Sequence, residues 1–240
     1  MFIADPAALR QDPIVLGGPE GRHAATVRRL SAGERADVTD GAGAVAECVV
    51  TAVAQGVVEF QVLARRDEPA PDPSIVIVQA IPKGDRAELA VGLMTEVGAD
   101  VVVPWQAERC VAQWRGDRAA KALDRWRRAA RDAAKQSRRR RFPEVPGPAG
   151  LRDVAARAAA ASLAIILDPE APVALQRLRL PPHGQIMVIV GPEGGVSPAE
   201  TAELAGAGAV SARLGPTIMR TSTAGAAAIA VLLAASGRWD

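Results

Sequence analysis

The sequence predicts an α/β protein in which a small, β-rich N-terminal domain precedes a larger domain built around a mostly parallel sheet. Three observations lead to this prediction. Short strand-like segments with glycine turns fill residues 1–67, alternate prolines occupy 68–73, and strand-like and helix-like segments alternate from residue 74 onward. Strands that alternate with helices form parallel sheets covered on both faces. Prolines that join neither a ladder nor a helix make a spacer, so we place the domains at residues 1–70 and 73–240.

The first domain is expected to be a small barrel of short strands with one helix. Its strand-like segments are bounded by glycine-containing turns. They cover residues 36–40, 44–50 and 57–63. Apolar positions that recur every three or four residues predict a helix over residues 23–30, with an exit turn near Gly33. This helix would carry Arg28 and Arg29.

Five apolar segments of the second domain are predicted to be strands. Most are continuous runs rich in Val and Ile, without the alternation of a half-exposed strand, as expected for strands buried on both faces. The segments are residues 74–80, 101–104, 163–167, 186–190 and 209–214.

Capping signals and periodicity predict the helices between these strands. The segment Asp85-Arg86-Ala87-Glu88 matches a capping box and opens a helix to about Val97, ended by Gly98. Ser197, Pro198 and Glu200 give a second strong helix start. Three further helices are predicted over residues 118–138, up to about 161 after a proline-rich loop, and from Thr221 or Thr223 to 235.

The composition is that of a soluble globular protein. Of the 240 residues, 49% are hydrophobic and 23% are charged. No apolar run reaches the length that spans a bilayer, and the first residues lack the features of a signal peptide. Cys48 and Cys110 lie far apart without metal-ligand spacing. We therefore expect two reduced thiols in a cytoplasmic protein.

Positive charge is concentrated in one part of the chain. The formal net charge is only +2, yet a dense basic block runs from Arg115 to Arg141 and ends in four consecutive arginines. The planar guanidinium group binds phosphate with two hydrogen bonds. A basic block in a nearly neutral chain indicates a polyanion partner. RNA or DNA contact is favoured over the alternative, a solvated helix face.

Two glycine-containing loops in the last third of the chain predict a ligand site. Residues 191–195 and 214–224 each follow a strand-like run and lead into a helix. Loops at the carboxyl ends of neighbouring strands form one crevice in open α/β sheets. Neither loop is a phosphate loop, which favours a flat, nucleoside-like ligand without a polyphosphate. The alternative is that these glycines only serve turn geometry.

Few residues are available for metal or acid–base chemistry. The chain has no H-E-x-x-H motif, cysteine cluster or paired carboxylates, so a metal is not expected. It also lacks the G-x-S-x-G motif of serine hydrolases. His183 lies in a predicted turn, and His23 lies in the other domain. Glu193 and Arg220 are the charged members of the predicted crevice.

The two glycine loops resemble the cofactor-binding end of SPOUT methyltransferases. The resemblance is best to the ribosomal RNA small subunit methyltransferase E family. Four further segments agree with that family: its first sheet unit, a segment around Arg109, a basic helix and the start of its PUA-like domain. They are residues 83–99, 108–111, 125–137 and 23–30.

The resemblance implies a fold and an activity. The fold would be a Rossmann-like SPOUT sheet with a C-terminal trefoil knot, preceded by a PUA-like β-barrel. The activity would be S-adenosylmethionine-dependent methylation of N3 of a uridine in 16S ribosomal RNA, within the assembled small subunit, by a homodimer. Two alternatives stay open. One is methylation of another RNA, transfer RNA or large-subunit RNA. The other is a non-catalytic, RNA-binding ribosome-assembly factor.

The resemblance also implies roles for residues of this sequence. Arg220 and Arg109 would stabilise a developing uracil anion, and Glu193 would accept the N3 proton. The alternative for Arg220 and Glu193 is a salt bridge that pins the two loops together. The implied cofactor-binding residues are Leu167, Val190, Gly191, Pro192, Gly194, Gly195, Leu214, Gly215, Ile218 and Met219. The implied RNA-binding residues are Arg28, Arg29, Lys83, Arg86, Arg138 and Arg139.

Two positions of the last loop depart from the family pattern. Thr217 stands where the family commonly has arginine, and Ser222 stands where it commonly has glutamate. The roles of those family side chains therefore do not transfer to this chain.

Overall fold

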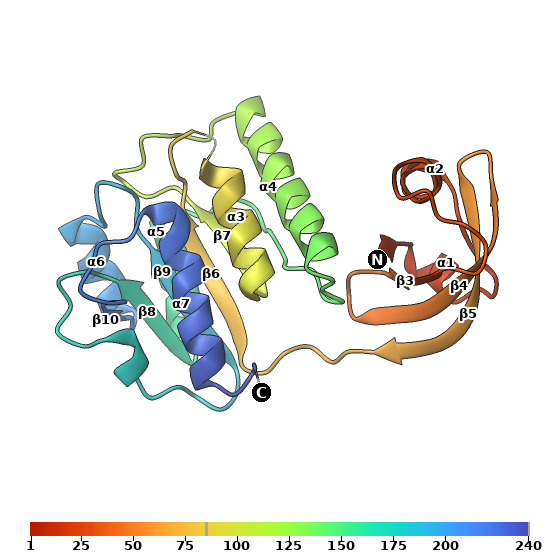
Figure 1. Ribbon diagram of the computed structural model, residues 1–240. Coiled ribbons are helices and arrows are strands. Elements are labelled where there is room, and N and C mark those ends of the chain that lie inside the picture. The colour runs from red at the N-terminus through yellow and green to blue at the C-terminus, as the bar shows by residue number, and fades with distance from the viewer. Residues whose placement is uncertain (85, 240) are drawn as a thin grey trace. The chain divides into compact units, whose positions relative to one another are not determined.

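The computed structural model describes residues 1–84 and 86–239. The chain forms two compact units (Figure 1). The N-terminal unit comprises Met1–Ala70 together with Ala134–Phe142, and the C-terminal unit comprises Pro71–Ala133 and the residues from Pro143 onward. The predicted capping box at Asp85 includes a residue that lies outside the described ranges.

The N-terminal unit is built on one curved, five-stranded sheet. The strands lie in the order β1-β3-β4-β5-β2, with β1 parallel to β3 and the other neighbours antiparallel. Register shifts along the β4–β5 pair mark bulges, which bend a sheet. Phe2, Ile14, Val58 and Phe60 are buried in its core. The strands are β1 (Phe2–Ile3), β2 (Ile14–Leu16), β3 (Arg35–Thr39), β4 (Ala44–Ala54) and β5 (Val57–Asp67).

The helical part of this unit begins and ends earlier than predicted. A short helix α1 (Pro6–Leu9) is followed by α2 (Gly18–Arg22), which continues as the π-helix η1 (His23–Val27). The prediction of a helix over residues 23–30 was therefore wrong at both ends. Pro19 in the first turn starts the helix early, because its ring fixes a helical φ. Arg28 and Arg29 follow the last turn, and Arg29 has a positive φ of 51°.

A segment distant in sequence completes the N-terminal unit. The Lys135 ammonium group lies 2.7 Å from Glu20 Oε1, and Glu20 Oε2 accepts a hydrogen bond from the backbone N–H of Ile3 at 3.2 Å. Arg141 Nε donates to the carbonyl of Glu68 at 2.7 Å. These contacts attach the end of the long helix α4 (Asp117–Gln136) and its following turn to the first sheet. The proline-rich segment alone did not predict this return of the chain.

The C-terminal unit contains a five-stranded, fully parallel sheet. Its order is β10-β8-β9-β6-β7, and every neighbouring pair is parallel. The predicted parallel sheet is therefore confirmed, although β10 is shorter than the predicted segment. The strands are β6 (Ser74–Ala80), β7 (Val101–Trp105), β8 (Leu163–Leu167), β9 (Gln185–Val190) and β10 (Val210–Ala212).

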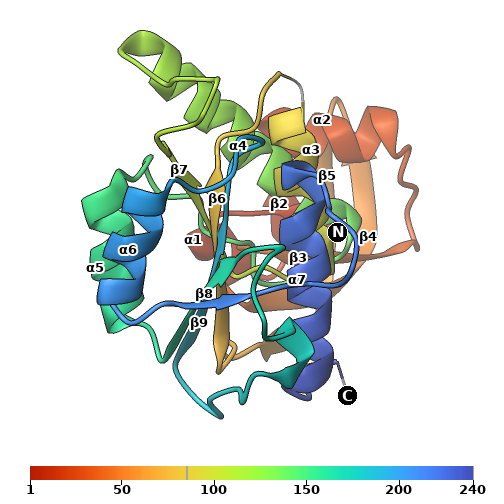
Figure 2. The ribbon, with the colours of Figure 1, turned by 90° about the vertical axis from the view of Figure 1, so that its left-hand side faces the viewer.

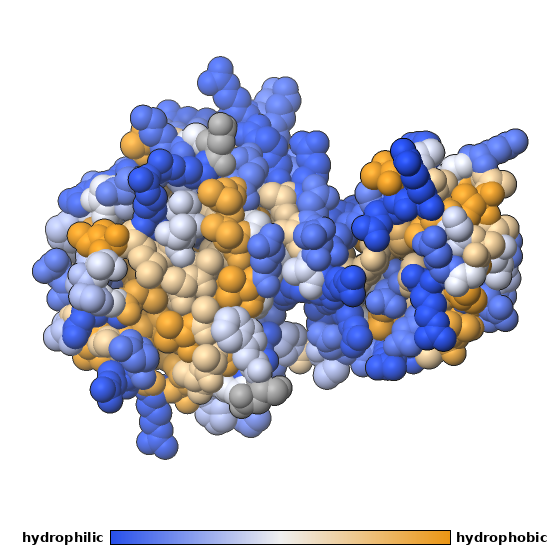
Figure 3. All heavy atoms as spheres, viewed as in Figure 1, coloured by the Kyte–Doolittle hydropathy of each residue, from blue (hydrophilic) through white to orange (hydrophobic). Residues whose placement is uncertain are grey.

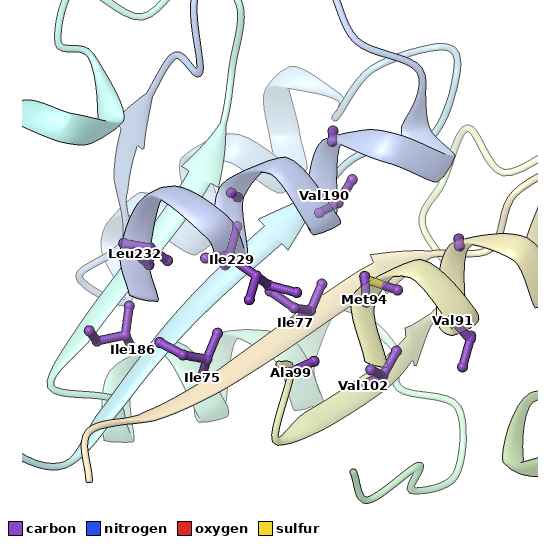
Figure 4. Packing of buried hydrophobic residues seen from close by; sticks show 14 of the residues in the cluster. Ile75, Ile77, Val91, Met94, Ala99, Val102, Ile186, Val190, Ile229 and Leu232 are labelled. Carbon is purple, nitrogen blue, oxygen red and sulfur yellow. The ribbon is translucent and has the colours of Figure 1, made fainter. Parts of the chain in front are cut away.

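Helices cover both faces of this sheet, as Figure 2 shows. On one face, α3 and α7 pack over Ile75 and Ile77; on the other, α5 and α6 pack over Val76 and Val78. Alternate residues of β6 are thus buried on opposite faces, which explains its uninterrupted apolar run. In Figure 4, Ile229 of α7 lies over this first face. The helices are α3 (Arg86–Val97), α5 (Leu151–Ala160), α6 (Pro198–Gly206) and α7 (Thr221–Ala235).

Local signals set several helix ends. The Ser197 side chain accepts from the backbone N–H of Glu200, and the Glu200 carboxylate accepts from that of Ser197, so the predicted capping box is confirmed. The helix predicted over 118–138 instead ends at Gln136. Arg138 then adopts a positive φ of 56°, which no helix tolerates.

The connection between β8 and β9 runs beside the chain that leaves β10. The backbone N–H of Arg213 donates to the carbonyl of Val173 at 2.9 Å, and the N–H of Leu175 donates to the carbonyl of Arg213 at 2.8 Å. The last segment of the chain is therefore hydrogen-bonded to that connection before α7 begins. The trefoil knot implied by the family resemblance stays a prediction.

Candidate active site

A cavity of about 700 Å³ lies where β8 and β9 end and where α7 begins. The two glycine-containing loops form its walls, as the sequence predicted. All ten predicted cofactor-binding residues line it: Leu167, Val190, Gly191, Pro192, Gly194, Gly195, Leu214, Gly215, Ile218 and Met219. The carboxyl ends of parallel strands are the usual position of a ligand crevice.

The loops require glycine for different structural reasons at different positions. Gly195 has a positive φ of 74°, and its N–H donates to the carbonyl of Pro192 at 2.8 Å, so it serves the turn. A Cβ on Gly191 would lie 2.8 Å from Val196 Cγ2, so packing requires the missing side chain. A Cβ on Gly215 would meet nothing within 4 Å. Turn geometry and packing thus explain the first two positions, but they do not explain Gly215.

Among the described residues, four charged side chains line the cavity: Arg86, Asp168, Glu193 and Arg220. Glu193 Oε1 accepts from the backbone N–H of Lys83 at 3.3 Å, which joins this wall to the loop after β6. Arg220 is exposed, and within the described part of the chain no ion pair joins it to Glu193. The structure therefore does not contain the salt bridge that was the alternative role for this pair.

Arg109 reaches the cavity wall from another loop. It belongs to residues 106–116, which follow β7, and its Nη1 atom donates to the carbonyl of Gly194 at 2.9 Å. Arg109 is therefore beside the wall but is not part of the cavity lining. In the same loop Cys110 is buried, and burial raises the pKa of its thiol, so that side chain does not supply a thiolate.

Several lining residues were not predicted. Asp168 directly follows β8, and position at a strand end is a signal that should have identified it. Thr201, one turn into α6, has no local signal because only the fold brings it to the cavity. The remaining unpredicted residues are Ile166, Pro169, Val196, Thr221 and Ala224, together with the divergent positions Thr217 and Ser222.

The predicted RNA-binding residues fall into two groups. Lys83 and Arg86 belong to the C-terminal unit, and both side chains are exposed. The other four, Arg28, Arg29, Arg138 and Arg139, belong to the N-terminal unit.

The run of four arginines is partly occupied by contacts within the N-terminal unit. Arg139 Nε donates to the carbonyl of Arg141 at 3.1 Å, and Arg140 lies 3.7 Å from Glu68. Arg138 is exposed. The run therefore has a structural role as well as its positive charge.

The described residues contain neither a metal-binding cluster nor a membrane-spanning helix. Within residues 1–84 and 86–239, no three His, Cys, Asp or Glu side chains are grouped so that they could hold a metal ion. In the same ranges, no helix combines the length and apolar character needed to cross a bilayer.

Comparison with known proteins relates both units to RNA methyltransferases. Residues 68–233 match the family described as RNA methyltransferase domain, and residues 16–60 match the family described as RNA methyltransferase PUA domain. The chain is 46% identical over 230 residues to ribosomal RNA small subunit methyltransferase E of Mycobacterium bovis. That alignment covers 94% of this chain and 88% of the relative. The Bacillus subtilis protein of the same name is 29% identical over 215 residues, which cover 86% of this chain and 84% of the relative.

Solved structures agree over nearly the whole chain. A putative methyltransferase from Legionella pneumophila, in complex with the bound cofactor SAM, is 28% identical with a TM-score of 0.84. It matches over 98% of this chain and 96% of its own. Ribosomal RNA small subunit methyltransferase E from Neisseria gonorrhoeae, bound to S-adenosyl methionine, is 27% identical with a TM-score of 0.83, over 97% and 96% of the two chains. The predicted fold class, a PUA-like domain followed by a SPOUT-type α/β sheet, is confirmed.

Proposed function

The chain belongs to the ribosomal RNA small subunit methyltransferase E family, and on that premise we propose that it methylates N3 of a uridine in 16S ribosomal RNA with S-adenosylmethionine. One observation carries the proposal: the cavity is lined by all ten residues that the resemblance assigns to the cofactor. Calorimetric titration with S-adenosylmethionine tests the first half. An affinity in the micromolar range supports it, and absence of binding would contradict the proposal that the protein is a methyltransferase.

The lining fits this cofactor chemically. Its volume lies within the usual range of ligand pockets, roughly 300–1,000 Å³. Leu167 and Val190 contribute apolar atoms to the lining, which suits an adenine ring. At Gly215 the missing side chain leaves the backbone open to close approach by a flat ligand. Asp168 also lines the cavity, and we assign its carboxylate to accept hydrogen bonds from the ribose hydroxyls.

Filling the cavity from Gly215 should block cofactor binding without unfolding the protein. A side chain at this position enters open space, and its φ is not in the left-handed region. We expect Gly215→Phe to weaken S-adenosylmethionine binding about 10- to 100-fold, the effect of 1–3 kcal/mol of overpacking. Calorimetry measures the affinity. Gly147→Phe is the matched control, because a Cβ there also meets nothing within 4 Å but lies outside the cavity. Equal losses in the two variants would contradict this placement of the cofactor.

The reaction requires help at the uracil ring rather than at the cofactor. Bound S-adenosylmethionine supplies an electrophilic methyl group. Uracil N3 carries a proton at neutral pH, so a base must remove it as the nitrogen becomes nucleophilic. We assign proton removal to Glu193, which lines the cavity. The Arg220 and Arg109 guanidinium groups would stabilise the negative charge that develops on the ring, and the cavity walls would hold the two reactants in line.

RNA binding is proposed to depend on basic residues of both units. Arg28, Arg29 and Arg138 are exposed in the N-terminal unit, and Lys83 and Arg86 in the C-terminal unit. A PUA-like domain and exposed arginines suit phosphate contacts, and a base inside a folded ribosomal RNA must be flipped out before methylation. An assembled small subunit as substrate would place the enzyme in the cytoplasm.

Such binding should weaken steeply with salt. If the six predicted side chains each neutralise one phosphate and each contributes ~0.7 to the slope, affinity should fall about 300-fold between 50 and 200 mM salt. Filter binding to 16S ribosomal RNA or small subunits at graded salt measures this slope. Arg28→Ala with Arg29→Ala should reduce the slope by about 1.4, two contacts' worth at ~0.7 each. A flat salt response would contradict the assignment.

We also propose that the enzyme works as a homodimer through α7. This helix has no charged residue from Thr221 to Ala235, and Ala226, Ala227, Ala230 and Val231 are partly exposed. Figure 3 shows that apolar surface over the face on which α7 lies in Figure 1. A helix that is apolar on all sides is normally buried. A second copy would cover this face and also Ile218, which is 82% exposed at the cavity.

A further inference from the structure

The buried carboxylate of Glu200 has a contact that helix capping does not require. Glu200 is in the first turn of α6 and is only 3% exposed. Its Oε2 atom accepts from the backbone N–H of Ser197 at 2.9 Å, which completes the capping box. Its Oε1 atom accepts from the backbone N–H of Glu108 at 2.7 Å, 92 residues earlier in the chain. One carboxylate therefore holds both the start of α6 and the loop after β7.

That loop, residues 106–116, is also closed on itself. Gln106 Oε1 accepts from the backbone N–H of Trp114 at 3.0 Å, and Gln106 Nε2 donates to the carbonyl of Ala112 at 3.1 Å. The N–H of Cys110 donates to the carbonyl of Ala107 at 3.1 Å. These contacts fix the internal shape of the loop. Its placement against the cavity wall then depends on contacts that reach outside it.

Two such contacts lie at adjacent residues. One is the bond between the Glu108 N–H and Glu200, and the other is the bond from Arg109 Nη1 to the carbonyl of Gly194. The wall is also closely packed here, because a Cβ on Gly194 would lie 3.3 Å from Arg109 Cβ. The backbone position of Glu108 thus sets where the Arg109 side chain begins.

We propose that Glu200 is a positioning residue for methyl transfer, acting through the Glu108 N–H to hold Arg109 at the rim of the cavity. The inference rests on the proposed function, in which Arg109 stabilises charge on the uracil ring. Glu200 does not line the cavity, so it would act through the Glu108 N–H and not directly on a reactant. Its bond to Glu108 is charge-assisted and partly buried, and its loss should free the loop without changing the cavity lining.

Glu200→Gln tests the role, because the amide keeps the size of the side chain but can no longer accept from both N–H groups. We expect kcat/KM for small subunits to fall about tenfold, with S-adenosylmethionine affinity unchanged. The control Ser197→Ala removes the cap from the N–H of Glu200 and leaves the bond to Glu108 intact. It should lower the melting temperature as much as Glu200→Gln does, yet retain kcat/KM.

A double-mutant cycle separates positioning from general stability. If Glu200 acts through Arg109, then Glu200→Gln should cause no further loss in an Arg109→Ala background. An unchanged tenfold loss in that background would overturn the proposal, as would an equal loss of kcat/KM in Ser197→Ala. If Glu200→Gln does not fold, Gln106→Ala loosens the same loop without touching α6. It should likewise cause no further loss of kcat/KM in the Arg109→Ala background.

Amide hydrogen exchange provides a readout that does not need activity. Peptides covering residues 106–116 should exchange faster in Glu200→Gln than in the wild type, and should not in Ser197→Ala. Faster exchange in a protein that methylates no ribosomal RNA would show that the bond between Glu200 and the Glu108 N–H holds the loop, and that the proposed function is wrong. Unchanged exchange in Glu200→Gln would show that Glu200 does not hold this loop in place, and would overturn the proposal whatever the activity.

Discussion

Replacing Arg220 with alanine is expected to lower kcat by about 10²- to 10³-fold, the typical cost of removing one donor aimed at a developing negative charge. Arg220 lines the cavity and is exposed, and no ion pair to Glu193 occupies its guanidinium group within the described residues. A guanidinium that is not engaged by the protein is available to the substrate. Single-turnover methylation of small subunits with saturating S-adenosylmethionine measures the step directly.

The control for Arg220→Ala is Arg152→Ala. Arg152 is exposed on α5, in the same unit but outside the cavity. It should keep the wild-type kcat, which excludes a general effect of losing one positive charge. Unchanged turnover in Arg220→Ala, accompanied by a lower melting temperature, would show that Arg220 is structural.

Placing a charge on the exposed face of α7 is expected to separate the two subunits and to reduce methyl transfer about 10²-fold. Ala227 and Ala230 are one turn apart on the partly exposed side of a helix that carries no charge. A glutamate buried at the centre of an interface is strongly unfavourable without a basic partner. The loss of rate follows because misplacing one wall of a site by about 1 Å can cost 10²-fold.

Light scattering measures the expected change, from a particle of twice 24.9 kDa to one of 24.9 kDa. Ala227→Glu is compared with Ala156→Glu, which introduces the same charge on an exposed position of α5. The control should stay dimeric and active. A wild type that is monomeric at micromolar concentration, or an Ala227→Glu variant that is monomeric and fully active, would contradict the proposed dimer.

Much of the second domain was predictable because its signals are local. The continuous apolar run from Ser74 to Ala80 predicts a strand. The run is uninterrupted because helices cover both faces of that strand. The capping box at Ser197 fixes the start of α6 without reference to the rest of the fold. Glycine-containing loops after two such strands predicted the cavity, because parallel strands share one carboxyl edge.

The features that were missed depend on contacts between distant segments. Strands β1 and β2 have two and three residues, too few for any periodicity. The return of residues 134–142 to the first sheet depends on the pair of Lys135 with Glu20, and the placement of Arg109 depends on Glu200. No local pattern contains either contact. The identity of the cofactor came from resemblance, because backbone-lined cavities do not specify one ligand.

Mapping ribosomal RNA modification in a strain that lacks this protein tests the central claim most directly. Methylation at N3 blocks base pairing, so reverse transcription stops at the modified uridine. Wild-type small-subunit RNA should give one strong stop that disappears in the deletion strain and returns when the gene is restored. The Arg220→Ala variant should not restore it. An unchanged pattern of stops in 16S ribosomal RNA, or a stop lost from transfer RNA or large-subunit RNA instead, would contradict the proposed function.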